Sequence, residues 1–430
     1  MTGNRRCDEP APRAPSLLPP APGALARGGA AGPADVILTA AVVGLVAFGV
    51  VMVFSASAVR AGQFYGNPAH FLVRQAVFAV LGVFAMLSIA RIDYHRYRPL
   101  TYPILGVSVF LLVVVAFGFG RSAGGAARWI QLGPINIQPA EAAKLALVLW
   151  LAYSLSKKAE RIKSFEVGFL PHALMAGLLM LLCLKQPDFG SAVMIGLLTF
   201  AMLFAAGARL GYLLGAVLLA LPAVYLLIAT SPYRMRRIRA FLAPFEHRMN
   251  EGYQVFESLL SFGAGGVTGV GIGDGRQKLF FLPEAHTDFI GAIVAEELGF
   301  VGVFLLIVVF VVIVARGFRV ALRAADDYGS YLAVGVSTFL GLQAFTNLAV
   351  AMGMLPTKGL VLPFVSYGGS SLLVNCAACG LLLNVSRPRA VAALTEEPRN
   401  GRSVRRGDAA PTRRPSGGQR RRAREAGGMA

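Results

Sequence analysis

Charged residues are scarce in this sequence. Only 15% of its 430 residues are Asp, Glu, Lys or Arg, whereas 56% are hydrophobic. Soluble domains carry about a quarter of charged residues, so the composition excludes a soluble globular protein. Apolar stretches close to the ~20 residues that cross a bilayer recur along the chain instead. The composition therefore predicts a multi-span integral membrane protein of the all-α class.

Cysteines are also few, and they do not suggest a disulfide framework. There are four, of which Cys7 lies near the N-terminus and Cys183 within an apolar stretch. Cys376 and Cys379 form a C-x-x-C in the last apolar stretch, without His or acidic companions. The spacing favours small residues used for helix packing over a redox or metal role.

Several catalytic motifs are absent. The sequence holds no HExxH, no nucleotide-binding P-loop and no Ser/His/Asp elbow, which excludes the enzyme classes that depend on them. The glycine-rich segment "GAGGVTGVGIGDG" (263–275) matches no dinucleotide fingerprint. It is interpreted either as flexible backbone beside a substrate or as a plain loop.

About ten transmembrane helices are predicted, with a large loop between the seventh and the eighth, at about residues 231–288. The flanking segments 1–34 and 391–430 are predicted to be disordered tails, the second rich in arginine, around a membrane domain at 35–390. The predicted spans are 36–57, 71–90, 100–119, 140–156, 168–184, 190–206, 211–229, 289–315, 331–353 and 371–386.

Basic residues predict the orientation. With the N-terminus inside, Arg91, Lys157, Lys158 and Arg316 fall in short cytoplasmic loops, and the external loops are poorer in Lys and Arg. Both termini are then cytoplasmic and the 231–288 loop is external. The net charge of +19 is mostly a tail effect and does not indicate nucleic acid. The tail can bind anionic lipid or a cytoplasmic partner, or it can be a solvated end.

Four polar clusters lie in or beside spans on the predicted outer side, where polar residues are functional candidates. In "GGAARWIQLGPINIQPAEAAK" (124–144), Arg128 is an interfacial anchor or an anion contact, and Glu141 and Lys144 can pair at i, i+3. In "KQPDFGSA" (185–192), Asp188 is a helix N-cap or a substrate or ion contact.

The other two clusters lie later in the chain. "YRMRRIRAFLAPF" (233–245) suits a segment on the membrane surface or arginines that hold phosphate groups, and "GYQVFESLLSFGAGG" (252–266) predicts a short amphipathic helix. "LPTKGLVLPFVSYGGSS" (355–371) is irregular backbone that needs partners within a bilayer. Together the four clusters predict a cavity that opens outward.

"FLPEAHTDFIGAIVAEELGF" (281–300) is the most acidic stretch beside a span. With Pro283 in the first turn of a helix, Glu284 and Asp288 share one face, while Glu296 is rotated by about 80° and lies ~12 Å further along. Asp288, at the membrane rim, is the best candidate for a general acid or base. A plain helix N-terminal carboxylate is the alternative. Glu296 and its neighbour Glu297 are predicted to have structural or ion-pairing roles.

"GRQKLFFLPEAHTDFIGAIVAEELGFVG" closely resembles the signature of the SEDS family, bacterial multi-span proteins typified by FtsW and RodA. The likeness extends to the other clusters and to "LPFVSYGGSSL", over about residues 36–390. "GRQK" before "LPEAHTD" is more similar to the division type than to the elongation type. The sequence departs from the family at Ala140 and Ala142, where "QPSE" and a larger apolar residue are usual.

The resemblance implies a peptidoglycan glycosyltransferase that polymerises lipid II at the outer face of the bacterial cytoplasmic membrane, at the division septum. It implies a class B penicillin-binding protein and other division proteins as partners, besides membrane lipid. It places the essential aspartate on Asp288. A lipid II flippase, an elongation-type polymerase and a non-catalytic scaffold are the alternatives.

The reaction needs cations for a departing pyrophosphate. A divalent Mg or Mn ion can share that task, with Asp188 and Asp288 as possible ligands, and no organic cofactor is expected. The predicted substrate-binding residues are Arg128, Glu141, Lys144, Lys185, Gln186, Asp188, Arg276, Lys278, Glu284, His286, Lys358, Ser366 and Ser370.

Overall fold

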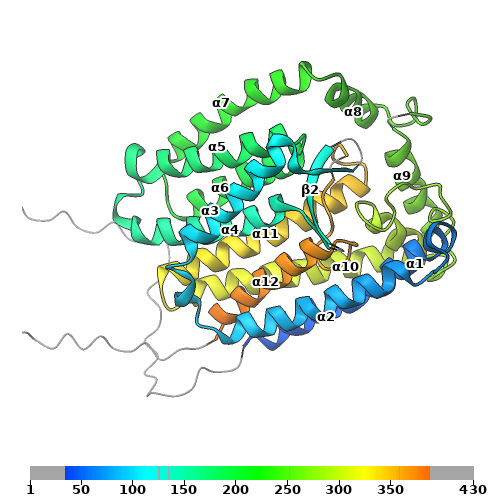
Figure 1. Ribbon diagram of the computed structural model, residues 1–430, viewed down its shortest axis with the longest axis horizontal. Coiled ribbons are helices and arrows are strands. Elements are labelled where there is room, and N and C mark those ends of the chain that lie inside the picture. The colour runs from blue at the N-terminus through cyan, green and yellow to red at the C-terminus, as the bar shows by residue number, and fades with distance from the viewer. Residues whose placement is uncertain (1–33, 124–125, 134, 251, 358, 388–430) are drawn as a thin grey trace, which may run out of the picture. The chain divides into compact units, whose positions relative to one another are not determined.

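Helices at all ten predicted stretches form a bundle in the computed structural model (Figure 1). The structure describes residues 34–387 except 124–125, 134, 251 and 358; the predicted tails lie outside it, apart from Ala34. The ten helices are α1 Val36–Tyr65, α2 His70–Arg91, α3 Thr101–Val114, α4 Pro139–Lys157, α5 Leu170–Lys185, α6 Phe189–Ala205, α7 Leu210–Ala229, α10 Ile290–Leu322, α11 Asp327–Ala351 and α12 Gly369–Val385. The all-α membrane fold is confirmed.

The ten helices differ in how much lipid they can face. Within the described residues, eight spans are long and apolar enough to cross a membrane. The apolar helix α6 is shorter, and α4 carries Glu141 and Lys144. In α11 and α12, 72% of the apolar window is buried, against 6% in α7. Most residues of α4 are buried too. The polar residues of α4 therefore lie among other helices rather than in lipid, where they would be costly.

Helix α1 is longer than predicted. It runs to Tyr65 rather than to residue 57, and it ends at Gly66, whose φ of 67° closes the helix with a bond from the Gly66 N–H to the Gly62 carbonyl. Glycine adopts this left-handed conformation without the steric cost of a Cβ. At 1.5 Å per residue, 30 residues span about 45 Å, well beyond the ~30 Å hydrocarbon core.

A small antiparallel sheet between α3 and α4 was not predicted. Its strands are β1 Arg121–Ala123, β2 Ala126–Leu132 and β3 Ile135–Ile137, in the order β1-β2-β3. Strand β2 pairs with β3 so that Ile130 lies opposite Ile137. Gly133, with φ of 60°, allows the tight turn between them. The sheet fixes the backbone of Arg128, which a free loop would not.

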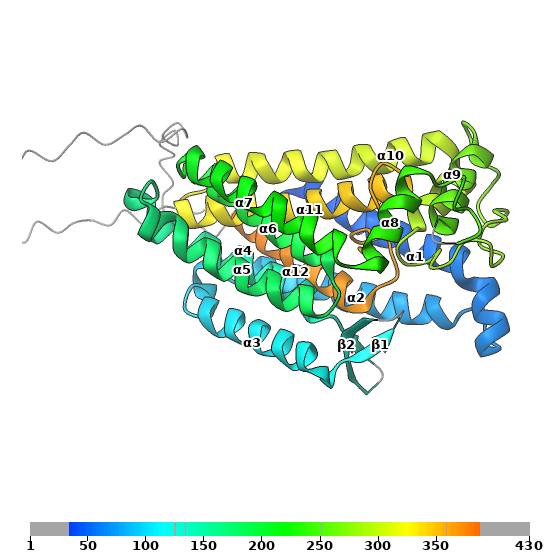
Figure 2. The same cartoon turned by 90° about the horizontal axis from the view of Figure 1, so that it is seen from above.

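The long loop between α7 and α10 folds into two short helices, α8 Pro232–Leu242 and α9 Tyr253–Gly265. The amphipathic helix predicted at 252–266 is confirmed as α9. Figure 2 shows α8, α9 and the sheet at one end of the bundle, which we call the cavity end. Helices α4, α6, α10 and α12 begin there.

Helix α10 is interrupted at Gly299, which has φ of 65° and ψ of −163°. The glycine-rich segment packs into this break. The N–H groups of Val270 and Gly271 donate to the carbonyls of Glu296 and Glu297 at 3.0 Å each. A Cβ on Gly269 would lie 2.2 Å from the Glu297 carbonyl oxygen. The segment is therefore more than a plain loop, because it satisfies the backbone groups that the break exposes.

Candidate active site

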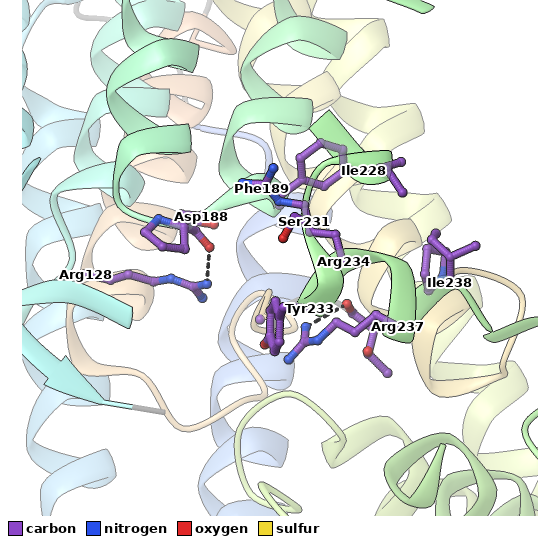
Figure 3. A pocket seen from close by; sticks show the side chains of 14 residues that line it. Arg128, Asp188, Phe189, Ile228, Ser231, Tyr233, Arg234, Arg237 and Ile238 are labelled. Carbon is purple, nitrogen blue, oxygen red and sulfur yellow. Dashed lines mark hydrogen bonds between the residues drawn. The ribbon is translucent and has the colours of Figure 1, made fainter. Parts of the chain in front are cut away.

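A cavity of about 460 Å³ opens at the cavity end, between α6, α7, α8, β2 and the residues Pro356, Thr357 and Gly359 (Figure 3). Three arginines and one aspartate line it, together with apolar and small residues. The charged lining residues are Arg128, Asp188, Arg234 and Arg237. The excess of positive charge suits an anionic group, since planar guanidinium binds phosphate in bidentate fashion.

The arginines reach the cavity from two separate elements. Strand β2 carries Arg128, whose Nη2 donates to the Pro187 carbonyl. Arg234 and Arg237 lie three residues apart on α8 and so share a face. The Nη1 atom of Arg237 donates to the Thr357 carbonyl at 3.0 Å, and that of Arg234 donates to the Leu227 carbonyl at 2.8 Å. Guanidinium has five donors, so these single bonds orient each arginine and leave donors for a ligand.

Asp188 has a structural role and a place in the cavity wall. It is the N-cap of α6, accepting bonds from the Ser191 N–H at 3.1 Å and the Ser191 hydroxyl at 2.8 Å. The N-cap interpretation is therefore confirmed. Two other residues predicted to bind substrate, Gln186 and Lys185, do not line the cavity. Gln186 is buried and donates to the Leu112 carbonyl, whereas Lys185 lies over the ring of Phe117.

Asp288 borders the cavity from the turn before α10. A Cβ on Gly359 would lie 3.5 Å from its Oδ2 atom and 3.2 Å from Arg128 Nη1. The two groups therefore approach the same small residue of the cavity wall. Asn347 donates to the Asp288 carbonyl at 2.9 Å, which fixes the backbone. Within the described residues, no side chain forms a hydrogen bond or ion pair with the Asp288 carboxylate.

The surroundings of Asp288 make its carboxylate basic. Burial raises the pKa of Asp288 to about 7, and the negative charges of Glu284 and Asp188 add to the rise, whereas Arg128 and Arg237 oppose it. A carboxyl group with this pKa is a far better proton acceptor at neutral pH than one at its ordinary value near 4. The residue remains partly accessible, so a substrate can reach it.

The helix predicted to begin at Pro283 is wrong. Residues 283–289 form turns, Glu284 has φ of 56°, and α10 begins only at Ile290. Glu284 and Asp288 therefore do not share a helix face. The exposed Glu284 carboxylate accepts a bond from the Thr287 hydroxyl at 2.9 Å. Pro283 does not begin a helix, because the turn at residues 283–289 bonds to the loop that precedes α12.

Two serines predicted to bind substrate bond to backbone instead, and Ser366 ties that loop to the Asp288 turn. The Ser366 hydroxyl donates to the Thr287 carbonyl at 2.6 Å and accepts from the Leu362 N–H at 2.8 Å. Ser370 accepts from the Gln138 N–H at 3.3 Å. Both serines therefore hold backbone in place, as irregular segments within a bilayer require. Lys358, which belongs to the same loop, lies outside the described residues.

His286 lies beside this turn and is largely buried. Its ring packs against Phe71 at 4.8 Å and Tyr367 at 5.7 Å between centroids. Burial lowers the pKa of His286 to about 4; the nearby charge of Arg60 adds to this, and Glu284 opposes it. His286 is therefore neutral at physiological pH, which favours a packing or polar contact over cationic binding of phosphate.

Lys278 and Arg276 do not gather around Asp288 as predicted. Lys278 forms a buried ion pair with Glu297, with 2.7 Å between Nζ and Oε1, and the Ser55 hydroxyl donates to the same carboxylate. Glu296 accepts the Arg276 N–H at 2.7 Å, and the Arg276 residue is exposed. The predicted structural roles of Glu296 and Glu297 are confirmed, because they hold this loop on α10.

Glu141 and Lys144 also pair away from the cavity. Their side chains are fully buried, with 2.7 Å between Lys144 Nζ and Glu141 Oε1. Gln343 adds a longer contact of 3.5 Å to Glu141, and Phe339 lies beneath the ammonium group. Since neither residue lines the cavity, the structure supports the ion-pair interpretation over a direct substrate contact.

Arg234 and Arg237 were missed as individual site residues. The alternation in "YRMRRIRAFLAPF" indicated phosphate-binding arginines or a membrane-surface segment, and only the position of α8 separates the arginines that face the cavity from the others. No group of three or more His, Cys, Asp or Glu that could hold a metal occurs in the described part of the chain.

The fold and the site define a multi-span membrane protein with a basic cavity and a neighbouring carboxylate of raised pKa at one end of the bundle. The family model for FtsW, RodA and SpoVE, described as "Cell cycle protein", matches residues 36–390. The chain belongs to this family, the SEDS proteins.

Relatives and solved structures agree with that membership. The chain is 50% identical to the probable peptidoglycan glycosyltransferase FtsW of Geobacter metallireducens, over 82% of this chain and 94% of that protein. It is 42% identical to stage V sporulation protein E of Bacillus subtilis, over 82% and 97%. A chain of a peptidoglycan synthase complex matches with a TM-score of 0.67 and 32% identity, over 82% and 97%. RodA of Thermus thermophilus matches with 0.61 and 32%, over 82% and 96%.

Proposed function

We propose that this protein is a peptidoglycan glycosyltransferase that polymerises lipid II into β-1,4 glycan strands during septal wall synthesis. The observation that carries the proposal is the convergence of Arg128, Arg234 and Arg237 on a cavity bordered by Asp288. A lipid pyrophosphate is the anionic leaving group that such a cavity suits. The names of the relatives point to the same activity.

The reaction is a single inverting displacement at the anomeric carbon of the donor's muramyl sugar. The 4-hydroxyl of the acceptor glucosamine attacks from the β face, its proton passes to Asp288, and the bond to the α-linked lipid pyrophosphate breaks. A positioned base supplies about 10² to 10⁴ in rate. Inverting glycosyl transfer needs no covalent enzyme intermediate, so one carboxylate suffices.

The arginines stabilise the departing pyrophosphate. Its negative charge grows as the anomeric bond breaks, and preorganised donors aimed at that charge lower the barrier. Arg128 and Arg237 are each held by a backbone carbonyl, so little reorganisation accompanies the reaction. Because they also lower the pKa of Asp288, the same cations keep enough of the base ionised at neutral pH.

A divalent Mg or Mn ion remains part of this proposal. Mg²⁺ is typically held by one or two carboxylates and by substrate phosphate oxygens. Asp288 and Asp188 fit that sparse set, because Asp188 lines the cavity and its negative charge acts on the Asp288 carboxylate beside it. When bound, the ion would help to neutralise the pyrophosphate. No organic cofactor is part of the proposal.

The cavity end faces the outside of the bacterial cytoplasmic membrane in this proposal. Arg91, Lys157 and Arg319 lie in the last turns of α2, α4 and α10, at the end opposite the cavity. A basic cytoplasmic side then puts both termini inside. The synthase complex that resembles this chain coordinates polymerization and crosslinking, so a class B penicillin-binding protein is the proposed partner, with other division proteins, at the septum.

Purified protein with its cognate penicillin-binding partner, made transpeptidase-dead, tests the proposal on lipid II. We expect wild type to form glycan strands and Asp288→Asn, which keeps the side-chain shape, to lose activity by about 10² to 10⁴. Both must bind the partner equally. If wild type makes no strands with a competent partner while a known polymerase does, the transporter or scaffold alternatives gain.

A further inference from the structure

A row of aromatic rings connects the α1–α2 turn with the Asp288 turn. Tyr65 stacks on His70, with 4.1 Å between ring centroids and 5° between planes, and meets Phe71 edge-on at 5.6 Å. Phe71 in turn contacts His286 at 4.8 Å and Tyr367 at 5.1 Å. We call these five residues the aromatic track. It begins at the rim of the molecule and ends two residues before Asp288.

Burial along the track increases toward the active site. Tyr65 is 56% exposed, Phe71 and Tyr367 are half-buried, and His286 is 6% exposed. The inner end is therefore part of the core, whereas the outer end presents an aromatic ring to the surroundings. Large apolar surface left open next to a site of chemistry is typical of binding surfaces.

Helix length places the outer end beyond the expected hydrocarbon core. Asp35, the N-cap of α1, forms an ion pair with Arg316, and charged groups of this kind are costly within the hydrocarbon core, so we take this level as one membrane boundary. Ser55, in contact with the charged Glu297 and Lys278, lies about 30 Å along the helix from there, the thickness of the hydrocarbon core. Tyr65 stands ten residues further, about 15 Å beyond that level.

The turn that presents Tyr65 is rigid before any ligand arrives. Gly66 closes α1 in the left-handed region, the Asn67 side chain accepts the Ala69 N–H at 2.9 Å, and the His70 N–H donates to the Asn67 carbonyl at 3.1 Å. A preorganised surface loses little entropy on binding. The stacked pair Tyr65 and His70 is therefore a fixed platform.

We propose that the open outer end of the aromatic track, Tyr65 stacked on His70, binds the growing glycan strand. The faces of aromatic rings carry negative partial charge and attract the C–H groups of a sugar ring. The arginine cavity is lined from α6, α7, α8 and β2, whereas the track belongs to α1, α2, the Asp288 turn and the loop before α12. Figure 1 shows α8 and α1 on opposite edges of the cavity end. The pyrophosphate and the strand thus occupy different sides of Asp288. This inference rests on the proposed function.

Strand length at equal lipid II consumption tests the inference. Full-length protein in lipid bilayers, with its transpeptidase-dead partner, is compared with Tyr65→Ala. We expect strands about two- to tenfold shorter, the change in retention that loss of one aromatic contact represents. Tyr65→Phe keeps the ring and should keep the length. Tyr102→Ala is the matched control, since Tyr102 is 60% exposed on α3 at the other end of the bundle.

The outcomes separate the inference from the proposed function. If Tyr65→Ala forms strands of wild-type length, the track does not bind the growing strand. If the strand length is unchanged and only the Tm falls, Tyr65 is an interfacial anchor instead. Equal shortening by Tyr102→Ala would overturn it too. Absence of strands from wild type would instead overturn the polymerase itself.

Discussion

Asp288 and Glu297 are carboxylates of the same short segment, and the structure treats them in opposite ways. Glu297 is fully buried and bonded to Lys278 and Ser55. Asp288 is partly accessible, and no described side chain bonds to its carboxylate, whose pKa is raised. A buried charge is tolerated when partners satisfy it. A carboxylate without partners beside a cavity is instead available for proton transfer.

The Glu297 region is built by long-range contacts rather than by local sequence. The break at Gly299 and the glycine-rich segment that fills it place Lys278 next to Glu297. The Asp288 region depends on the same kind of contact, since Ser366 and Asn347 fix its backbone. In both regions the backbone is held by hydrogen bonds, but among the described residues Glu297 has side-chain partners and the Asp288 carboxylate has none.

Removing the partner of Glu297 gives the largest expected loss of stability. Lys278→Ala leaves the Glu297 carboxylate buried without its cation, which costs about 3 to 5 kcal/mol of unfolding free energy. Thermal unfolding in detergent or bilayers measures this. Arg276→Ala, at an exposed residue of the same loop, should change stability by no more than about 0.5 kcal/mol. Equal stability of the two variants would contradict the structural role of the ion pair.

Removing an arginine from the cavity should affect substrate binding more than stability. Arg237→Ala loses charge-assisted bonds worth about 1.5 to 3 kcal/mol, so KM for lipid II should rise by about ten- to a hundredfold. Arg239→Ala is the control, because Arg239 is exposed on α8 and does not line the cavity. A similar rise of KM in Arg237→Ala and Arg239→Ala would show that α8 acts only through its overall positive charge and not through the position of Arg237.

The pH dependence of the rate reports the charge of Asp288. The base acts when deprotonated, so activity should fall about tenfold per pH unit below its pKa, which is about 7, and level off above it. Arg237 lowers this pKa, so Arg237→Ala should move the acid limb to higher pH. A rate that stays constant from about pH 5 to about pH 8 would argue against Asp288 as the base.

The raised pKa has a second consequence, for stability. The protonated form is favoured in the folded state, so the contribution of Asp288 is fully present below its ordinary pKa near 4 and is lost as the pH rises through about 7. Asp288→Asn should remove this dependence and leave the protein at least as stable at pH 8. A lower Tm for this variant at pH 8 would contradict the expectation that the ionised Asp288 carboxylate destabilises the folded protein.

Composition and motifs predicted much of this molecule. Hydrophobic length alone located the helices, since each span must satisfy its own backbone bonds, and the position of Asp288 at the rim made it the candidate base, which stays a prediction. The pairing of Lys278 with Glu297, the sheet that holds Arg128 and the orientation of α8 were not predictable. Each depends on contacts between segments far apart in the chain, and the break at Gly299 changes the face on which later residues lie.

The most direct test of the contrast compares Asp288→Asn with Glu297→Gln for lipid II polymerisation and thermal unfolding in the same bilayers. We expect Asp288→Asn to unfold like wild type or later but to form no strands, whereas Glu297→Gln should unfold earlier and, below its Tm, still form them. Strands from Asp288→Asn at the wild-type rate, with Glu297→Gln folded and inactive, would place the chemistry at Glu297 and contradict the account.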